Sequence, residues 1–453
     1  MGKIIDMRHI LKAAVAIALL AGSHGALTAQ EAGSQGGQRL TVSAADCRAM
    51  ALQSSEEMRK SSNEVAMAEM EKWAATTNFL PKIDAMATGT YVFPDMDMMG
   101  MKMQMHGMYV AGFQLTQPIY AGGKIVAGHK LSKIGEGVAR EQQRLTEMDV
   151  IANAETAYWN YVAVLGKVEL MRGYSNMLDT LYAQTQTAVE AGMTVKNDLL
   201  RVEARRSEIR YQQQKVNNGA DLCRMALCQA IGVSFDTEIV PKDSADDSAP
   251  SAPGVLSTDI GLRPELHLLE KQVEAKRQMV NLTRGDYLPT VGLSAGWNWY
   301  GNIKLNSMVE AMPGVYVPYT QKFEDGLGMV MLAVKVPLVR WGEGVKKVKK
   351  AKLEAENAQL DLDRNRRLLS LEARQAAANV EDGFAMIESA NVAMRQAAEN
   401  LRVTHDRYEE RMCPLSDMLD AQTQWQKASA DVIEARAQYR IYLTNYLKAT
   451  GKL

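Results

Sequence analysis

Two aspartates near the C-terminus are the carboxylates of this chain best placed to act together. Asp417 and Asp420 are three positions apart, so on a helix they share one face and present two negative charges side by side. Asp198 is the counterpart of Asp417 in an earlier version of the same segment. The alternative for one aspartate near a helix start is a helix cap. Because Tyr408 ends the preceding helical stretch, the Asp417–Asp420 pair is the stronger functional candidate.

A methionine-rich segment is the second group with chemical potential. Seven of the 28 methionines fall within residues 96–108, beside a histidine. Thioethers are soft ligands that suit Cu(I) or Ag(I). The alternative, which we favour, is a flexible hairpin tip in a methionine-rich protein, so no metal site is expected. The weak metal candidates are Met96, Met98, Met99, Met101, Met103, Met105 and His106.

No catalytic or cofactor-binding constellation stands out. The glycine-rich segment 121–124 lacks the spacing of a phosphate-binding loop and indicates a strand-to-helix turn. The six histidines form no i,i+4 pair, and Cys223 and Cys228 are not spaced as a zinc or redox motif. The balance of 52 basic and 53 acidic residues gives no argument for nucleic-acid binding. We expect neither an enzyme nor a cofactor.

The first 29 residues have the pattern of an export signal. Three basic residues precede the apolar run 13–20, and small residues at 27–29 fit a cleavage site. The apolar run is too short to span a bilayer, which disfavours a membrane anchor. Residues 1–29 are therefore expected to be a signal peptide.

The elements that must position these residues are present twice. Residues 118–123 reappear at 337–342, and residues 192–200 reappear at 411–419, both after 219 positions. A period of this length is too long for a solenoid unit. It describes two homologous halves with a rigid segment of equal length in each.

A third landmark shows where length varies. Leu80-Pro81 corresponds to Leu288-Pro289 with an offset of 208, so the second half has 11 extra residues before the next landmark. We expect a first repeat over 30–232, a linker over 233–258 that is rich in Ser, Asp, Ala and Pro, and a second repeat over 259–453.

Proline positions predict the helices. No proline lies between 119 and 240, and only Pro414 follows 337. Proline disrupts helix interiors, so these stretches favour long helices. Each stretch contains one break, which makes it a helical hairpin. The expected hairpins are 124–231, with arms 124–191 and 196–231, and 343–449, with arms 343–411 and 415–449; single helices are expected at 43–78 and 264–286.

Apolar and polar residues alternate in four further segments, which predicts strands. The segments are about 83–93, 109–118, 290–300 and 328–337. Each has roughly the 10 residues of a tilted membrane-spanning strand. Trp297 and Trp299, with Tyr91, Phe93 and Tyr109, lie where aromatic residues of a membrane interface are expected. The alternative is a pair of hairpins on a soluble core. Four strands cannot close a barrel, so membrane insertion requires several chains to share one.

The chain resembles the TolC-type outer-membrane efflux duct family. The resemblance covers about residues 40–451 and combines the signal peptide, the two halves, the Leu-Pro strand starts, the segment 117–123 and the segment 408–421. It implies a mainly α-helical homotrimer with membrane β structure, in which twelve strands form one barrel above a hollow helical cylinder in the periplasm. Such a duct is joined to an inner-membrane pump through a periplasmic adaptor and is embedded in outer-membrane lipid.

The resemblance also assigns roles by position. Asp417 and Asp420 look like constricting acidic rings, and Tyr408 and Asp198 look like a latch between the two hairpins. The position of the latch arginine corresponds to Cys413 here, and Arg411 replaces the tip glycine. Arg411 or Arg407 could supply the charge instead. The competing class is a structural or adhesive coiled-coil envelope protein without a channel. Whether the cargo is a drug, a metal or a protein stays open.

Overall fold

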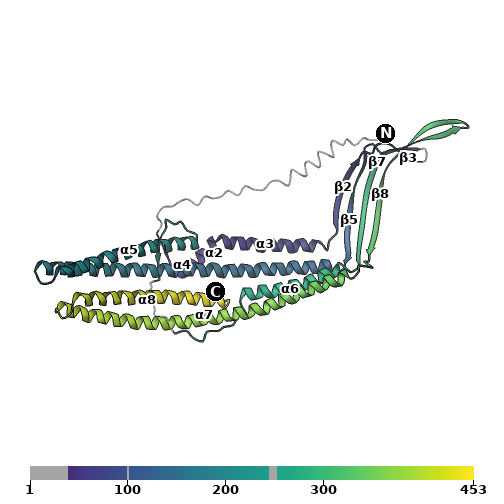
Figure 1. Ribbon diagram of the computed structural model, residues 1–453. Coiled ribbons are helices and arrows are strands. Elements are labelled where there is room, and N and C mark those ends of the chain that lie inside the picture. Colours follow the sequence, from purple (N-terminus) through teal and green to yellow (C-terminus); the bar gives the residue numbers. More distant parts are fainter. Residues whose placement is uncertain (1–38, 99–100, 244–251) are drawn as a thin grey trace.

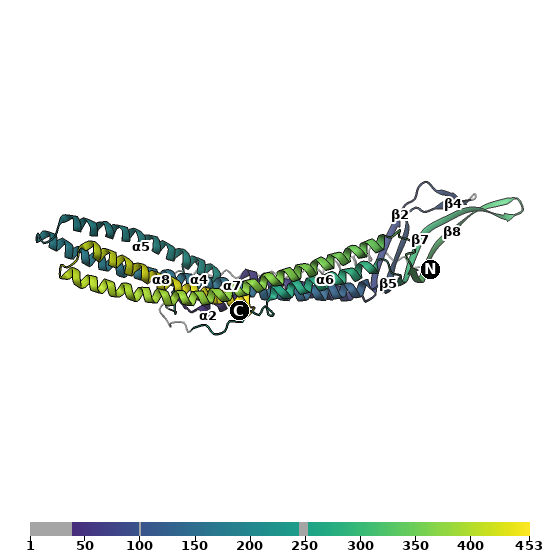
Figure 2. The same ribbon diagram turned by 60° about the horizontal axis from the view of Figure 1, so that its bottom comes forward.

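The computed structural model of this 453-residue chain describes residues 39–98, 101–243 and 252–453. The expected signal peptide, 1–29, and Met99 lie outside the described residues. A long helical body carries a β-sheet at one end, and two helical hairpin tips lie at the other (Figures 1 and 2). No helix within the described ranges is both long enough and apolar enough to cross a membrane.

Two helices of 67 residues run the length of the body. They are α4, Lys124–Glu190, and α7, Glu343–Glu409. At 1.5 Å per residue each is roughly 100 Å long. Each turns back into a shorter arm, α5 at Lys196–Ile231 and α8 at Leu415–Ala449. Helix α6, Pro264–Gly285, packs between α4 and α7 on the side of the sheet.

The helix expected over 43–78 is two helices, which corrects the prediction. Helix α2 covers Ala44–Ser54 and α3 covers Glu56–Thr77. Ser55 between them has extended backbone angles, and its side chain accepts a hydrogen bond from the Met58 amide. The sequence therefore contains an N-cap within the apparent helix, and the cap starts a new one.

The two halves share their backbone turns as well as their helix lengths. Left-handed backbone angles occur at 122, 123, 192 and 232, and again 219 positions later at 341, 342, 411 and 451. At the hairpin tips, the Met193 amide donates to the Ala188 carbonyl at 2.8 Å, and the Met412 amide donates to the Arg407 carbonyl at 2.7 Å. This bond closes a Schellman-type helix end in both halves.

Four antiparallel strands form the body of the sheet. Their order is β2 (Lys82–Thr90), β5 (Met108–Ala121), β7 (Thr290–Met312) and β8 (Val315–Lys335). The short strands β3, Met96–Met98, and β4, Met101–Gln104, form a hairpin that joins β7.

Strands β7 and β8 extend well beyond the predicted segments 290–300 and 328–337. They have 23 and 21 residues and pair with each other as far as Met312 and Val315. The added part is a two-stranded ribbon closed at Gly314, whose φ is +80°. The predicted strands are too short because they cover only the segments in which apolar and polar residues alternate most clearly.

One face of the sheet is apolar, and the other carries most of its polar side chains. Trp297 is opposite Phe113 of β5, and Leu293 is opposite Leu332 of β8. Because residues two positions apart share a face, the apolar face can be followed along each strand. It comprises Ile83, Ala85, Ala87, Ala111, Phe113, Leu115, Val291, Leu293, Ala295, Trp297, Trp299, Val330, Leu332 and Val334. The other face is mixed. It carries Asp84, Thr88, Gln114, Thr116, Ser294 and Asn298 on β2, β5 and β7, but Leu327, Met329 and Met331 on β8.

A second, parallel sheet joins the N-terminal segment to the expected linker. Strand β1, Arg39–Val42, pairs with β6, Glu238–Pro241. The segment 233–258 is therefore partly structured. Val42 and Ile239 are buried in one core cluster with Tyr158 of α4 and Leu227 of α5.

Candidate functional site

The two hairpin tips are held together by a shared apolar cluster. Tyr174 and Leu178 of α4 are fully buried there, together with Val202 and Ile209 of α5. The second hairpin contributes buried Leu415 and the partly buried side chains of Tyr408 and Leu419. The residues beside Asp417 on α8 therefore pack against the first hairpin.

Arg205 makes the clearest polar contact between the hairpins. Its Nη2 donates to the Thr423 hydroxyl of α8 at 2.8 Å, and its Nε donates to the Tyr174 hydroxyl at 3.2 Å. Burial alone would lower the pKa of Arg205, but its hydrogen bonds to Tyr174 and Glu208 raise it, so the side chain stays charged. Arg205 was not predicted from the sequence, because nothing in its local pattern indicates a partner 218 residues away.

Further contacts join α4 to α8 along their length. Lys448 pairs with Asp149 at 2.5 Å, and Lys167 pairs with Glu434 at 2.7 Å. Between them, the buried carboxylate of Glu155 pairs with Arg48 of α2 and accepts a hydrogen bond from Thr444. These contacts fix the register of α8 against α4.

Asp417 and Asp420 are both exposed and make no ion pair within the described part of the chain. The N-cap of α8 is Pro414, and no side chain caps this helix. Asp417 accepts only a long bond, 3.3 Å, from the Ser416 hydroxyl. The helix-cap alternative is therefore unsupported for Asp417, and both carboxylates are available to a partner or an ion.

The expected latch residues lie at the tips but are not joined as the family pattern implies. Asp198 accepts a hydrogen bond from Thr194 of its own hairpin at 2.8 Å. Tyr408 packs into the apolar cluster, and among the described residues no hydrogen bond links it to Asp198. Arg411 is the member that crosses between hairpins, with Nη2 at 3.7 Å from the Met193 sulfur. The thiol of Cys413 faces the Thr404 carbonyl of its own hairpin at 3.6 Å.

Gln422 is an unexpected feature of the same region. Its side chain is fully buried in α8, and neither its amide oxygen nor its amide nitrogen has a hydrogen-bond partner. An unpaired buried polar group costs about 1–3 kcal/mol. The packing of the helix that carries Asp417 and Asp420 is therefore less favourable than its apolar contacts alone suggest.

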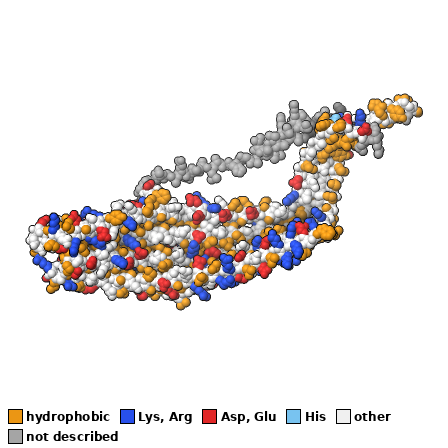
Figure 3. Space-filling view, viewed as in Figure 1, with side chains coloured by type: hydrophobic (Ala, Val, Ile, Leu, Met, Phe, Trp, Pro, Cys, Tyr) orange, Lys and Arg blue, Asp and Glu red, His pale blue; other side chains and the backbone are white. Residues whose placement is uncertain are grey.

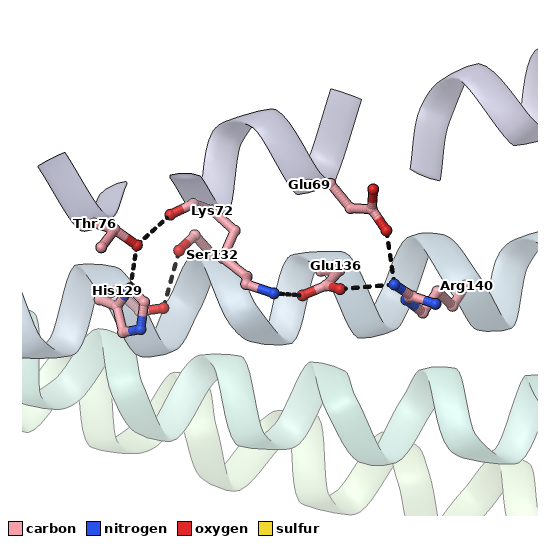
Figure 4. A network of polar contacts seen from close by, with 7 residues as sticks. All are labelled: Glu69, Lys72, Thr76, His129, Ser132, Glu136 and Arg140. Carbon is pink, nitrogen blue, oxygen red and sulfur yellow. Dashed lines mark hydrogen bonds and ion pairs between the residues drawn. The ribbon is translucent and has the colours of Figure 1, made fainter. Parts of the chain in front are cut away.

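At the sheet end of the body, a polar network joins α3 to α4, in contrast to the apolar cluster that joins the hairpin tips (Figure 4). Lys72 pairs with Glu136 at 2.6 Å, and Arg140 bridges Glu136 and Glu69. Lys72, and then Arg140, lower the pKa of Glu136 below its usual value. Near the helix ends, Thr76 contacts the His129 ring at 3.3 Å, and Ser132 bonds the His129 carbonyl (Figure 4).

The methionine-rich segment lies at the far end of the sheet. Met96 is opposite Met103 in the β3–β4 hairpin. His106 stacks on Tyr91 at 4.8 Å and pairs with Asp95 at 2.9 Å. The described residues contain no cluster of three His, Cys, Asp or Glu side chains suited to a metal. The ring of His106 is thus already engaged with protein groups.

Comparison with known proteins identifies relatives with this architecture. The family model described as "Outer membrane efflux protein" matches residues 48–233 and 255–452. The alkaline protease secretion protein AprF of Pseudomonas aeruginosa is 22% identical over 352 residues, which cover 74% of this chain and 69% of AprF. The outer membrane protein TolC of Escherichia coli is 22% identical over 405 residues, covering 88% and 80%.

The fold is also found in solved structures. The Campylobacter jejuni CmeC outer membrane channel superposes with a TM-score of 0.76 at 16% identity, over 90% of this chain and 85% of CmeC. The resemblance inferred from the sequence is confirmed by the family match, which covers both halves. The chain belongs to the outer membrane efflux protein family, whose members are outer-membrane channels extending into the periplasm rather than enzymes.

Proposed function

We propose that the protein acts as a homotrimer and forms the outer-membrane exit duct of a tripartite efflux or type I secretion system. The observation that carries this proposal is the open, amphipathic sheet. Strands β2 and β8 are its two edges, and each pairs on one side only among the described residues. Lipid tolerates no open strand edge. Three chains, with β2 of one beside β8 of the next, make a closed barrel of twelve strands.

The two faces of the sheet suit such a barrel. Ile83 and Leu332 on the apolar face are 69% and 62% exposed in the single chain. In a trimer this face contacts lipid. The other face surrounds the lumen, with polar residues on β2, β5 and β7 and with Leu327, Met329 and Met331 on β8. The alternation on β2, β5 and β7 is that of a membrane barrel.

The helical body has matching open faces. Helix α3 carries one apolar stripe, formed by Met67, Met70 and Trp73 at intervals of three residues. These side chains are 56%, 69% and 72% exposed in the single chain. On α7, Leu353 and Leu360 are exposed and seven positions apart. We infer that α3 of one chain packs against α7 of the next by coiled-coil contacts.

Asp417 and Asp420 are the proposed gate, with Tyr408, Asp198 and Arg411 as the proposed latch. Threefold symmetry would place three copies of each aspartate around one axis, and six carboxylates at a narrow end attract cations and repel one another. A periplasmic adaptor and an inner-membrane pump are the proposed partners at this end. The name of AprF refers to protease secretion, which supports a secreted protein as one class of cargo.

The test combines location, assembly and conductance. The protein should fractionate with outer membranes, migrate as a heat-modifiable trimer on gels, and form channels in planar bilayers. Asp417→Ala with Asp420→Ala should raise conductance and weaken block by divalent cations at least about tenfold. Glu381→Ala with Asp382→Ala, two exposed acidic residues on α7, is the matched control. A soluble, non-conducting protein would instead favour the coiled-coil envelope alternative, and unchanged block in the gate variant would remove the gate assignment.

A further inference from the structure

Cations gather where the helical body meets the sheet. Figure 3 shows Lys and Arg side chains concentrated over the ends of α6 and α7 beside the strands. The start of α7 has one acidic residue in its first turn, Glu343, followed by the lysines at 346, 347, 349, 350 and 352. Positive charge at a helix N-terminus opposes the helix dipole. This effect falls off after the first turn, but the lysines at 346 and 350 are also four positions apart and repel each other. An anionic partner would therefore relieve unfavourable charge in this part of α7.

A cleft of about 600 Å³ lies within this cationic region. Its basic side chains are Arg284 at the end of α6, Arg340 after β8, and Lys349 and Lys352 of α7. No acidic residue lines it. In the described part of the chain, Arg284, Lys349 and Lys352 form no ion pair, whereas the neighbouring Lys347 pairs with Glu343 at 2.6 Å. Three positive charges thus remain uncompensated at one site.

The remaining wall of the cleft is apolar and continues the apolar face of the sheet. Leu338 and Val345 line it and are 87% and 73% exposed. In the sequence, Val336 and Leu338 extend the alternation of Val334 beyond the end of β8. A ligand for this cleft therefore has an anionic group for the basic side chains and an apolar part that follows the sheet.

The first half carries a matching pair of lysines. Lys130 and Lys133 of α4 precede Lys349 and Lys352 by 219 residues, and all four are exposed. Both long helices are thus positively charged at the same distance from their first residue. In the proposed trimer these pairs would surround the base of the barrel.

We propose that this cleft binds the phosphate of an anionic phospholipid in the inner leaflet of the outer membrane, with the acyl chains lying along Leu338 and the apolar face of the sheet. Basic residues next to a membrane are each worth about 1 kcal/mol with anionic lipid. The assignment rests on the proposed insertion of the sheet into the membrane. It adds a lipid-binding collar that sets the depth of the duct.

The test titrates purified full-length protein in detergent with dioleoyl phosphatidylglycerol or dioleoyl phosphatidylethanolamine and counts retained lipids by native mass spectrometry. Wild type should retain phosphatidylglycerol preferentially. Arg284→Gln with Lys349→Gln and Lys352→Gln should weaken that retention on the order of 100-fold, a factor of about five for each charge. Lys349→Arg with Lys352→Arg should preserve it, and this variant guards against misfolding of the first.

The matched control is Lys196→Gln with Arg201→Gln and Lys215→Gln, which removes three exposed charges from α5 far from the sheet; it should leave retention unchanged. Soluble glycerol 3-phosphate at the same concentration should not compete, because it lacks the apolar part. Equal retention of the two lipids by wild type, or full retention by the triple glutamine variant, would overturn the proposal.

Two further outcomes also overturn it and separate it from the proposed channel. If wild type forms heat-modifiable trimers in vesicles but shows no headgroup preference, and the triple variant fails to trimerise, a second chain occupies the cleft. If the protein does not insert into vesicles of phosphatidylethanolamine and phosphatidylglycerol at all, the channel proposal fails and the collar fails with it.

Discussion

The tips of the two helical hairpins share a backbone but differ in their side chains. Both end the long helix with the same hydrogen bond, from residue 193 to 188 and from residue 412 to 407. The left-handed residue that makes this possible is Gly192 in the first half and Arg411 in the second, with φ of +70° and +59°. A left-handed residue other than glycine costs roughly 1–2 kcal/mol. The second half accepts this cost and gains a side chain that reaches Met193.

The same difference recurs at the other end of the long helices. Gly122 is replaced by Trp341, again with positive φ, and Trp341 is 96% exposed. The first half therefore uses glycine where the second half presents a large side chain at the surface. At both ends of the long helices, the second half thus places a large side chain where the first half has glycine, and these side chains are candidates for contacts with the proposed partners.

The largest expected effect concerns the cluster on which both tips depend. Leu178→Ala removes a fully buried side chain from this cluster and should lower the free energy of unfolding by about 3 kcal/mol. Denaturant unfolding in detergent measures it. Leu371→Ala on α7, where the leucine is 61% exposed, is the control and should cost under about 1 kcal/mol. Equal effects would mean that the shared cluster does not hold the tips.

The next effect concerns a position that is exposed in one half and buried in the other. Gln422 corresponds to Glu203 of α5, which is exposed. Gln422→Met keeps the volume and removes the unpaired amide, so it should stabilise the protein by about 1–2 kcal/mol. Thermal unfolding measures the change, and Glu203→Gln should leave it unaltered. A destabilised Gln422→Met protein would show that the amide is paired in solution.

Exchanging the tip residues sharpens the comparison directly. Gly192→Ala should destabilise by about 1 kcal/mol, because alanine resists left-handed angles. Arg411→Gly should have the opposite sign and a smaller size, about 0.5 kcal/mol, since glycine also gains entropy when unfolded. Matched unfolding curves of the two variants provide the measurement. Changes of the same sign would contradict the assigned difference in backbone cost.

The smallest effect is a pH dependence at Asp46, at the start of the first half. Hydrogen bonds from Lys242, and then from Ser43, lower the pKa of Asp46 to about 2. A lowered pKa stabilises the fold above the unfolded value near 3.8, and this contribution is lost as the pH falls toward 2. Asp46→Asn should therefore reduce the loss of helicity in circular dichroism between pH 4 and pH 2. Asp382→Asn on α7 should not, and equal curves for both variants would contradict the assignment.

The sequence predicted the parts of this structure that repeat or that proline delimits. The helices α4 and α7 could be placed because the spacing of 219 and the absence of proline define a long segment with fixed ends. The apolar face of the strands could be predicted because residues two positions apart on a strand lie on the same face. The length of β7 and β8 could not, since their outer ribbon is stabilised by mutual pairing rather than by an alternating pattern.

Contacts between the two halves could not be predicted from the sequence. Helical periodicity says which residues share a face but not which face of another helix they meet. The Arg205–Thr423 bond and the burial of Gln422 follow from the packing of the two hairpins against each other. For the same reason the position of Asp417 and Asp420 on α8 was predictable, whereas the replacement of a Tyr408–Asp198 contact by the Arg411–Met193 contact was not.

The meeting of short helices at mid-height has a mechanical consequence. Among the described helices, α5 and α8 end at this level and α3 and α6 begin, whereas only α4 and α7 continue past it without interruption. The Arg48–Glu155–Thr444 contact lies at this level. From Glu155 to the end of α4 at Glu190, the hairpin forms a lever roughly 50 Å long. A pivot of about 10° at the joint moves the tip by about 9 Å over such an arm. If the tips open as proposed, the interruption would serve as the pivot, and a small rotation at mid-body would be enough to widen a narrow opening.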